Sequence, residues 1–90
     1  MRRPNASSIS RKLHQMGFRL AYDYNHEGIR VRSGCTGDSR LTVIAQFDAD
    51  STSSRIAAEV REALTSAGYA CSEFYGHAAN IFHVAIDKFI

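Results

Sequence analysis

The spacing of apolar residues changes repeatedly along this chain, and that change most restricts its fold. Residues 6–16 have helical spacing, with apolar side chains at Ile9, Leu13 and Met16. From residue 18 the spacing becomes two, the period of a strand with one apolar face. Helical spacing returns over residues 51–67, and two more strand-like segments follow. The alternation predicts an α+β domain.

The predicted elements follow the order α-β-β-β-α-β-β. The first helix begins near Asn5 or Ser7, whose side chains can accept a first-turn amide bond, and ends at Gly17. The second helix begins near Asp50, which is predicted to cap it, and Gly68 is its C-terminal cap. Strands are expected at residues 18–24, 29–32, 41–47, 69–75 and 81–86.

Turn residues join these strands into hairpins. Residues 25–28 predict an antiparallel hairpin between the first two strands, and residues 76–80 predict a second hairpin. We therefore expect one mostly antiparallel sheet with both helices packed on one face. The 90 residues allow one small core, so residues 1–90 form a single domain, with residues 1–4 and 88–90 as flexible ends.

The sheet face opposite the helices is predicted to be open and of mixed polarity. Its apolar part makes Ile44, Ile81 and His83 the candidate protein-interaction face. Strand alternation assigns to this face Arg19, Asp23, Arg30, Arg32, Thr42, Ile44 and Gln46, with Ile81, His83 and Ala85 beside them.

Charge is unevenly distributed along the chain, although the formal net charge is only +2. Residues 1–32 contain seven basic and two acidic residues, a net charge of +5, and residues 33–90 contain four basic and seven acidic residues, a net charge of −3. An anionic partner would meet the N-terminal third. The candidate contacts with nucleic acid or an acidic partner are Arg11, Lys12, Arg19, Arg30 and Arg32.

One motif suggests enzymatic chemistry. The segment Asp48-Ala49-Asp50-Ser51-Thr52 resembles the Asp-x-Asp-x-Thr motif of haloacid-dehalogenase-like phosphohydrolases, in which the first Asp is a nucleophile and both carboxylates hold magnesium. That family has a doubly wound parallel sheet and further motifs, whereas 38 residues follow Thr52 and contain one lysine. A helix start explains both carboxylates better, so we predict no enzyme.

A double-stranded RNA-binding domain has the same order in its first five elements, α-β-β-β-α. Its second helix begins with a lysine cluster that contacts phosphates. Here the corresponding helix begins with Asp50 and contributes Arg55 alone to its first turns. Nucleic-acid binding through the basic first helix and the Arg30/Arg32 hairpin therefore remains the alternative to binding a protein.

The cysteines and histidines match no metal-binding pattern. Cys71, His77 and His83 have five residues between neighbours, unlike the spacings of zinc sites, and we expect no metal and no cofactor. Cys35 and Cys71 are predicted to be reduced thiols, and one disulfide between them is the alternative. Apolar stretches of four to six residues are too short to cross a membrane, and the N-terminus lacks the apolar core of a signal peptide, which predicts a cytoplasmic protein.

Three groups of residues carry a resemblance to a known group of proteins: Asn5-Ala6, Ile9-Ser10-Arg11, Leu13 and Gly17; Glu27-Gly28-Ile29-Arg30-Val31; and Leu64 with Ala67-Gly68-Tyr69. The chain resembles small uncharacterised proteins encoded by actinobacteria and their phages, from which its tail, residues 75–90, departs. The resemblance implies a phage or phage-derived accessory protein in the host cytoplasm. We expect a non-enzymatic binding protein whose partner is another protein or a second copy, without membrane or small-molecule substrate.

Overall fold

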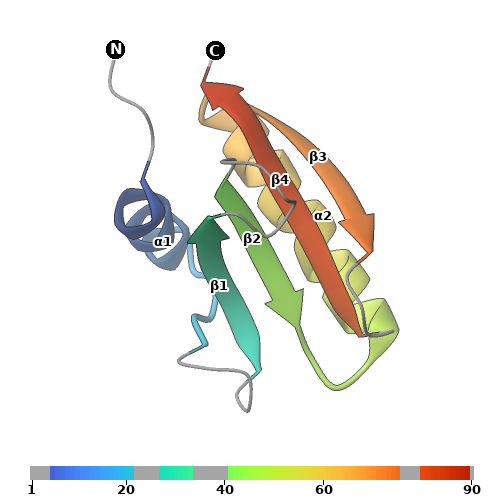
Figure 1. Ribbon diagram of the computed structural model, residues 1–90. Helices are drawn as coiled ribbons and strands as arrows, with labels where there is room; N and C mark the ends of the chain where they lie inside the picture. Colours follow the sequence, from blue (N-terminus) through green and yellow to red (C-terminus); the bar gives the residue numbers. More distant parts are fainter. Residues whose placement is uncertain (1–4, 22–26, 34–40, 76–79, 90) are drawn as a thin grey trace.

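The computed structural model describes residues 5–21, 27–33, 41–75 and 80–89, with side chains except at residues 33, 73–75, 88 and 89. The strands form one antiparallel sheet in the order β1-β2-β4-β3 (Figure 1), which confirms the α+β class. The elements are α1 (Ala6–Gln15), β1 (Gly28–Ser33), β2 (Leu41–Gln46), α2 (Asp50–Ser66), β3 (Tyr69–Tyr75) and β4 (Ile81–Phe89).

The last strand occupies an inner position of the sheet. Strand β4 is antiparallel to both β2 and β3, so β2 and β3 run in the same direction with β4 between them. Helix α2 makes the crossover from β2 to β3. The register aligns Val31 with Val43 and Val43 with Val84, which places one apolar residue from each of three strands in a row facing the helices.

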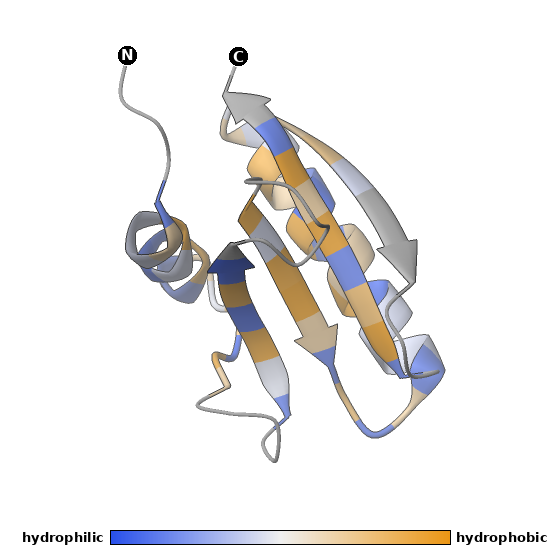
Figure 2. Cartoon of the chain, viewed as in Figure 1, coloured by the Kyte–Doolittle hydropathy of each residue, from blue (hydrophilic) through white to orange (hydrophobic). Residues whose placement is uncertain are grey.

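Both helices pack on the same face of the sheet, as predicted. Helix α2 contacts β2, β3 and β4, and α1 contacts β1 (Figure 1). Their apolar stripes meet in one cluster that includes the fully buried Ile9 and Leu13 of α1 and Val60 and Leu64 of α2. Figure 2 shows that β2 is mostly apolar whereas β1 alternates between apolar and hydrophilic positions. The polar positions of β1 belong to the other face of the sheet.

Of the first predicted strand, the described residues 18–21 form one bridge beside β1, and the direction of this bridge differs from the predicted hairpin. Leu20 pairs with Ile29 in a parallel bridge. The amide of Ile29 donates to the carbonyl of Arg19 at 2.8 Å, and the amide of Ala21 donates to the carbonyl of Ile29 at 2.9 Å. Alternation is the same in parallel and antiparallel strands, so it cannot predict direction. The rest of that predicted strand, residues 22–24, and most of the predicted turn lie outside the described residues.

Gly28 allows this close pairing. Its φ is +143°, and a Cβ atom at this position would lie 2.8 Å from the carbonyl oxygen of Arg19 and 2.9 Å from the amide nitrogen of Ala21. Contacts this short with backbone atoms cannot be relieved by a side-chain rotation. A glycine is therefore required where the segment after α1 passes β1.

The two helices begin differently. The side chain of Asn5 caps α1 and accepts a 2.8 Å bond from the amide of Ser8, as predicted. The prediction that Asp50 caps α2 is wrong, because Asp50 is the first helical residue and the N-cap is Ala49, which has no side-chain cap. The hydroxyl of the buried Ser53 instead accepts a 2.9 Å bond from the amide of Phe47 and ties the helix to the preceding strand.

Three further expectations concern the ends of elements. Gly17 and Gly68 follow the two helices with positive φ values, which confirms both as helix ends. Met16 is 44% exposed because α1 ends at Gln15, so it does not extend the apolar stripe. Residues 88 and 89 belong to β4 rather than to a flexible end, while residues 1–4 and 90 lie outside the described residues. Neither helix in the described part of the chain has the length and apolarity of a membrane span.

Candidate functional site

We call the sheet face opposite the helices the second face. Strand register arranges its side chains in rows that cross β1, β2 and β4. One row contains Arg30, Ile44 and His83. The next row contains Arg32, Thr42 and Ala85. The predicted assignment of these residues to one face is therefore correct.

This face is less exposed than the sequence predicts. Ile44 is only 6% exposed, and Thr42 and Ala85 are fully buried. Because it is buried, Ile44 does not offer the exposed apolar surface expected of it. The other two predicted protein-interaction residues, Ile81 and His83, are half-buried. Alternation indicates which face a side chain takes, but it does not indicate what that face contacts. Among the described residues, Met16 is the exposed large hydrophobic side chain.

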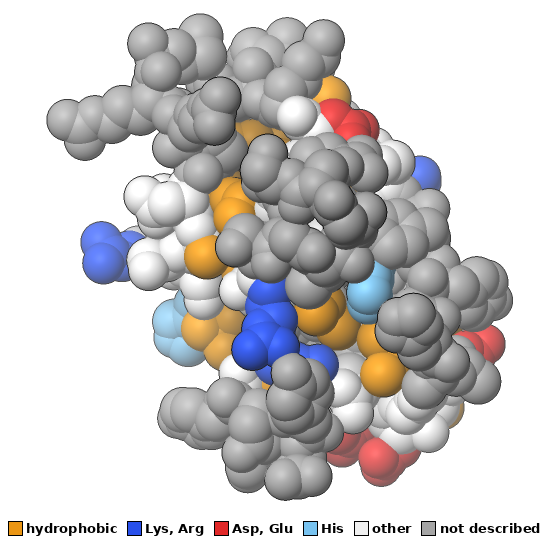
Figure 3. Space-filling model, in the orientation of Figure 1, with side chains coloured by type: hydrophobic (Ala, Val, Ile, Leu, Met, Phe, Trp, Pro, Cys, Tyr) orange, Lys and Arg blue, Asp and Glu red, His pale blue; other side chains and the backbone are white. Residues whose placement is uncertain are grey.

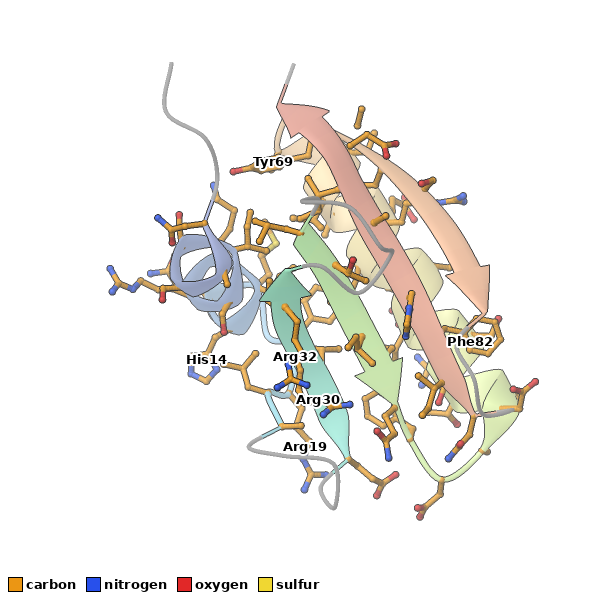
Figure 4. The ribbon with its side chains drawn as sticks, viewed as in Figure 1. His14, Arg19, Arg30, Arg32, Tyr69 and Phe82 are labelled. Carbon is orange, nitrogen blue, oxygen red and sulfur yellow. The ribbon has the colours of Figure 1, made fainter. Side chains whose placement is uncertain are left out.

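Three arginines share the β1 side of the second face. Phe18 and Leu20 pack against the core, so alternation turns Arg19 between them to the opposite side, the side of Arg30. Arg19 and Arg32 are exposed, and Arg30 is half-buried. Figure 4 shows the labelled side chains of the three arginines one after another along β1. The parallel bridge thus brings together cations that are 11 to 13 positions apart in the sequence.

The Arg30 guanidinium is held in place on this face. Its Nη2 atom donates to Oε1 of Gln46 at 3.2 Å, across the β1–β2 pair. Arg30 lies opposite Ile44, and Gln46 lies two residues further along β2 on the same face. The bond therefore runs diagonally between the two strands. This bond fixes the position of a guanidinium group, whose planar fork of donors suits oxyanions.

Thr42 presents a buried hydroxyl at the centre of the second face. Within the described part of the chain, its Oγ1 atom is buried and makes no hydrogen bond. A buried hydroxyl without a partner costs about 1–3 kcal/mol, so its retention calls for an explanation. Nε of Arg30 and Nδ1 of His83 are buried polar atoms of the adjacent row, in residues that make other contacts. Sequence alternation placed Thr42 on this face but carried no signal of its burial.

Helix α1 adds two cations beside the same strand. Arg11 is exposed and Lys12 is half-buried, and both line a shallow depression on the outer side of α1 together with Asn5, Ser8 and Gln15. The helix contains no acidic residue. Because α1 packs against β1, these two cations and the three arginines flank one edge of the sheet from its two sides (Figure 1). We call these five residues the basic edge.

Among the described acidic residues, Glu27 precedes β1, and Asp48, Asp50, Glu59 and Glu62 lie before or on α2. Oε2 of Glu27 accepts a 2.9 Å bond from the amide of Asp48, which ties the start of β1 to the segment before α2. On α2, Arg55 and Glu59 form a 3.2 Å ion pair. Figure 3 shows Lys and Arg side chains over β1 near the middle of the view and Asp and Glu side chains near its margins. The uneven charge along the sequence is thus also uneven in space.

The residues of the phosphohydrolase-like motif do not share the context of that family. Asp48 and Asp50 are exposed at the start of α2, and the sheet is antiparallel where that family has a parallel one. Among the described residues, no three His, Cys, Asp or Glu side chains lie close enough to hold a metal ion. Cys35 and His77 lie outside the described residues.

Cys71 lies on β3 and packs against the apolar cluster. Burial raises the pKa of its thiol from 9.0 to about 11, the negative charge of Asp87 adds to the rise, and the positive charge of Arg61 opposes it. A thiol with a raised pKa is a poor nucleophile at neutral pH because the thiolate is scarce. Cys71 is therefore a packing residue.

Compared with known proteins, the chain matches no family model, no curated protein and no solved structure. Function is therefore inferred from the position, charge and burial of the described side chains.

Proposed function

We propose that this protein is a small non-enzymatic binding module that holds nucleic acid through its basic edge. One observation carries the proposal: Arg19, Arg30 and Arg32 project from one face along β1, with Arg11 and Lys12 on the adjoining helix. Their grouping in space supports a polyanionic ligand rather than a set of separately solvated charges.

The chemistry of the basic edge suits phosphate groups. Four of its five cations are arginines, whose guanidinium groups bind phosphate oxygens in a bidentate manner. Arg30 and Arg32 are two residues apart on one strand, so their Cα atoms are separated by about 7 Å. Such a row can contact successive phosphates along one nucleic-acid strand. The burial of Ile44 supports the same choice, because it leaves little exposed apolar surface on this face for a protein partner.

The distribution of acidic residues indicates which side of the molecule a polyanion would avoid. Glu59 and Glu62 are exposed on α2, and Asp48 and Asp50 lie at its start. Repulsion from these carboxylates disfavours binding of a polyanion on that side of the molecule. The proposed activity takes place in the cytoplasm, in that of a bacterial host if the chain is a phage accessory protein.

A titration at several salt concentrations tests this proposal. Fluorescence anisotropy with duplex RNA, duplex DNA and single-stranded DNA should show binding whose log affinity falls linearly with log salt. If all five cations contact phosphates of duplex DNA, the slope is about −4.5. The paired substitutions Arg19→Gln with Arg32→Gln, and Arg11→Gln with Lys12→Gln, should each reduce the slope by about 2.

Arg55→Gln is the matched control, because it removes one positive charge from α2, away from the basic edge. It should leave the slope unchanged. Absence of salt-sensitive binding to all three probes, or an equal effect of Arg55→Gln and Arg19→Gln, would show that the basic edge is not a nucleic-acid surface.

The separation of charge also favours a second candidate, an acidic protein partner or a second copy of the chain bound head to tail. In a second copy, the exposed carboxylates of α2 would face the basic edge. Light scattering at low and high salt distinguishes this candidate. A mass that increases with concentration at low salt and falls to that of a monomer at high salt supports it, and a monomer under all conditions excludes self-association.

A further inference from the structure

We infer that two copies of this chain form a two-fold dimer by antiparallel pairing of their β3 strands, which joins the two sheets into one. The inference goes beyond the proposed function and does not rest on it, because β3 and β1 are opposite edges of the sheet. Each copy keeps its basic edge open at the far end of the joined sheet.

The two edges of the sheet differ in their protection against pairing. An edge strand presents unpaired amide and carbonyl groups, which charged residues, proline, bulges or a covering segment normally block. At the β1 edge, residues 19–21 bond to Ile29, and Arg30 and Arg32 lie on the strand. Among the described strands β3 pairs with β4 alone, and residues 69–75 include no lysine, arginine or proline (Figure 1). The β3 edge therefore suits the addition of another strand.

β3 is regular enough to pair along its whole length. It contains seven residues. Ala70 pairs with Lys88, whereas the next residue, Cys71, pairs with Ile86. The register therefore skips Asp87 of β4, and the irregularity lies on the inner strand. The outer strand has no extra residue that would interrupt a second ladder of hydrogen bonds.

Symmetry restricts the register of the pair. In an antiparallel pair of identical strands related by a two-fold axis, opposed side chains lie on the same face, so one residue must lie on the axis opposite its own copy. With Ser72 on the axis, all seven residues of β3 are paired, and Cys71 lies opposite Glu73. Ser72 is exposed, small and uncharged. With Glu73 on the axis, like charges would be opposed, which destabilises a sheet. The axis therefore lies at Ser72.

Helix α2 allows the two copies to approach each other. It packs behind β4 and β3 (Figure 1), and the positive charge of Arg61 counteracts part of the rise in the pKa of the Cys71 thiol. The Arg61 side of α2 is therefore the side near β3. Ser54, Ala58 and Thr65 lie on this side, one or two turns away. These small side chains leave space for α2 of the second copy, at an axial separation of about 8–10 Å.

The molar mass of the full chain in solution tests the dimer. Light scattering at high salt should give twice the mass of one chain, because salt weakens head-to-tail attraction between charged surfaces but not strand pairing. Ser72→Lys opposes two positive charges on the axis, so the mass should fall to that of one chain. Ser72 is exposed, so this variant should keep its fold, which circular dichroism checks.

Ser7→Lys is the matched control. It makes the same change at an exposed position of α1, which packs against the opposite edge strand, and should leave the dimer intact. A wild-type protein that is monomeric at high salt would overturn the proposal and leave the β3 edge to a strand of another protein. A dimer that persists in folded Ser72→Lys would overturn it as well.

A disulfide tests the register independently of the lysine variant. In a Cys35→Ser, Cys71→Ser background, Ser72→Cys places two thiols on the axis, where opposed Cα atoms are about 4.5–5.5 Å apart, within the range of a disulfide. Oxidation should convert this variant to a covalent dimer, whereas Ser7→Cys in the same background should remain monomeric under denaturing conditions. Equal cross-linking of the two variants would show that the copies do not pair about Ser72.

Discussion

Helix α2 packs against three strands, β2, β3 and β4, whereas the main contact of α1 among the described elements is with β1. The two regions also differ in charge, since α1 contains no acidic residue and α2 contains Glu59 and Glu62 with Asp50 at its start. β1 is an edge strand that carries three residues of the basic edge on or beside it, while β4 is an inner strand paired on both sides.

This difference indicates a division of roles. Helix α2 covers three of the four strands, and the part that includes α1 and β1 presents the five cations of the basic edge. Charged residues at an edge with fewer tertiary contacts can change with little cost to the core. The proposed nucleic-acid surface and the buried core therefore consist of different residues.

Replacement of a buried leucine in either helix has the largest expected effect on the free energy of unfolding. Leu64 of α2 and Leu13 of α1 are both fully buried. Leu64→Ala should lower the free energy of unfolding by about 3–5 kcal/mol, and Leu13→Ala by about 2–3 kcal/mol, because a helix that packs on one strand can move to fill the cavity. Urea unfolding followed by circular dichroism measures both. Equal losses would mean that α1 is as firmly held as α2.

Substitution of Gly28, at the start of β1, has the next largest expected effect on the free energy of unfolding. Gly28→Ala should cost about 2–3 kcal/mol, because a Cβ atom would meet the backbone of residues 19–21 and the φ of +143° disfavours other residues. Gly17→Ala is the control, with a φ of +97° but no atom within 4 Å of the added Cβ, and should cost about 1 kcal/mol.

The same urea unfolding measurement applies to the glycine variants. A Gly28→Ala variant as stable as Gly17→Ala would show that the segment after α1 is not held against β1. The inference that Arg19 and Arg30 lie on the same face would then be wrong.

Substitutions at the two helix N-caps have smaller expected effects on stability. Asn5→Ala should destabilise the protein by about 1 kcal/mol, because it removes the bond to the amide of Ser8. Ala49→Ser should stabilise it by about 0.5–1 kcal/mol, because Ala49 already has the extended backbone of an N-cap and lacks only an acceptor. Thermal unfolding reports both changes, and a loss of stability in Ala49→Ser would contradict the cap assignment.

Cys71 gives the smallest effect, which appears only at high pH. Its pKa is about 11 in the folded protein and near 9.0 when unfolded, so the unfolded chain loses the proton first as the pH rises. The stabilisation from the buried thiol is complete below pH 9 and is lost between about pH 9 and 11. The stability difference between wild type and Cys71→Ser should shrink over that interval.

Thiol reactivity checks the same raised pKa. In a Cys35→Ser background, alkylation of Cys71 at pH 8 should be about a hundredfold slower in the folded protein than in urea, since two pKa units correspond to that ratio of thiolate. Asp87→Asn should increase the folded rate by a smaller factor. Equal rates in the folded and urea-unfolded protein would show that the thiol is exposed.

Much of the fold could be predicted from local signals. The Asn5 cap and the glycines that end both helices act within a few residues, and the alternation in residues 41–46 specifies both faces of β2. The candidate cations could be named but not placed relative to one another. Arg19 joins Arg30 through a parallel bridge, whose direction has no signature in the alternation of Phe18 and Leu20.

By itself, the sequence determined the α+β class, the position of both helices, the faces of the strands and the excess of positive charge in the first 32 residues. These properties depend on periodicity and capping, which act over short distances along the chain. The tertiary structure alone decided the order β1-β2-β4-β3, the burial of Thr42 and Ile44, and the gathering of Arg19, Arg30 and Arg32. Those depend on contacts between residues far apart in sequence, which no local pattern records.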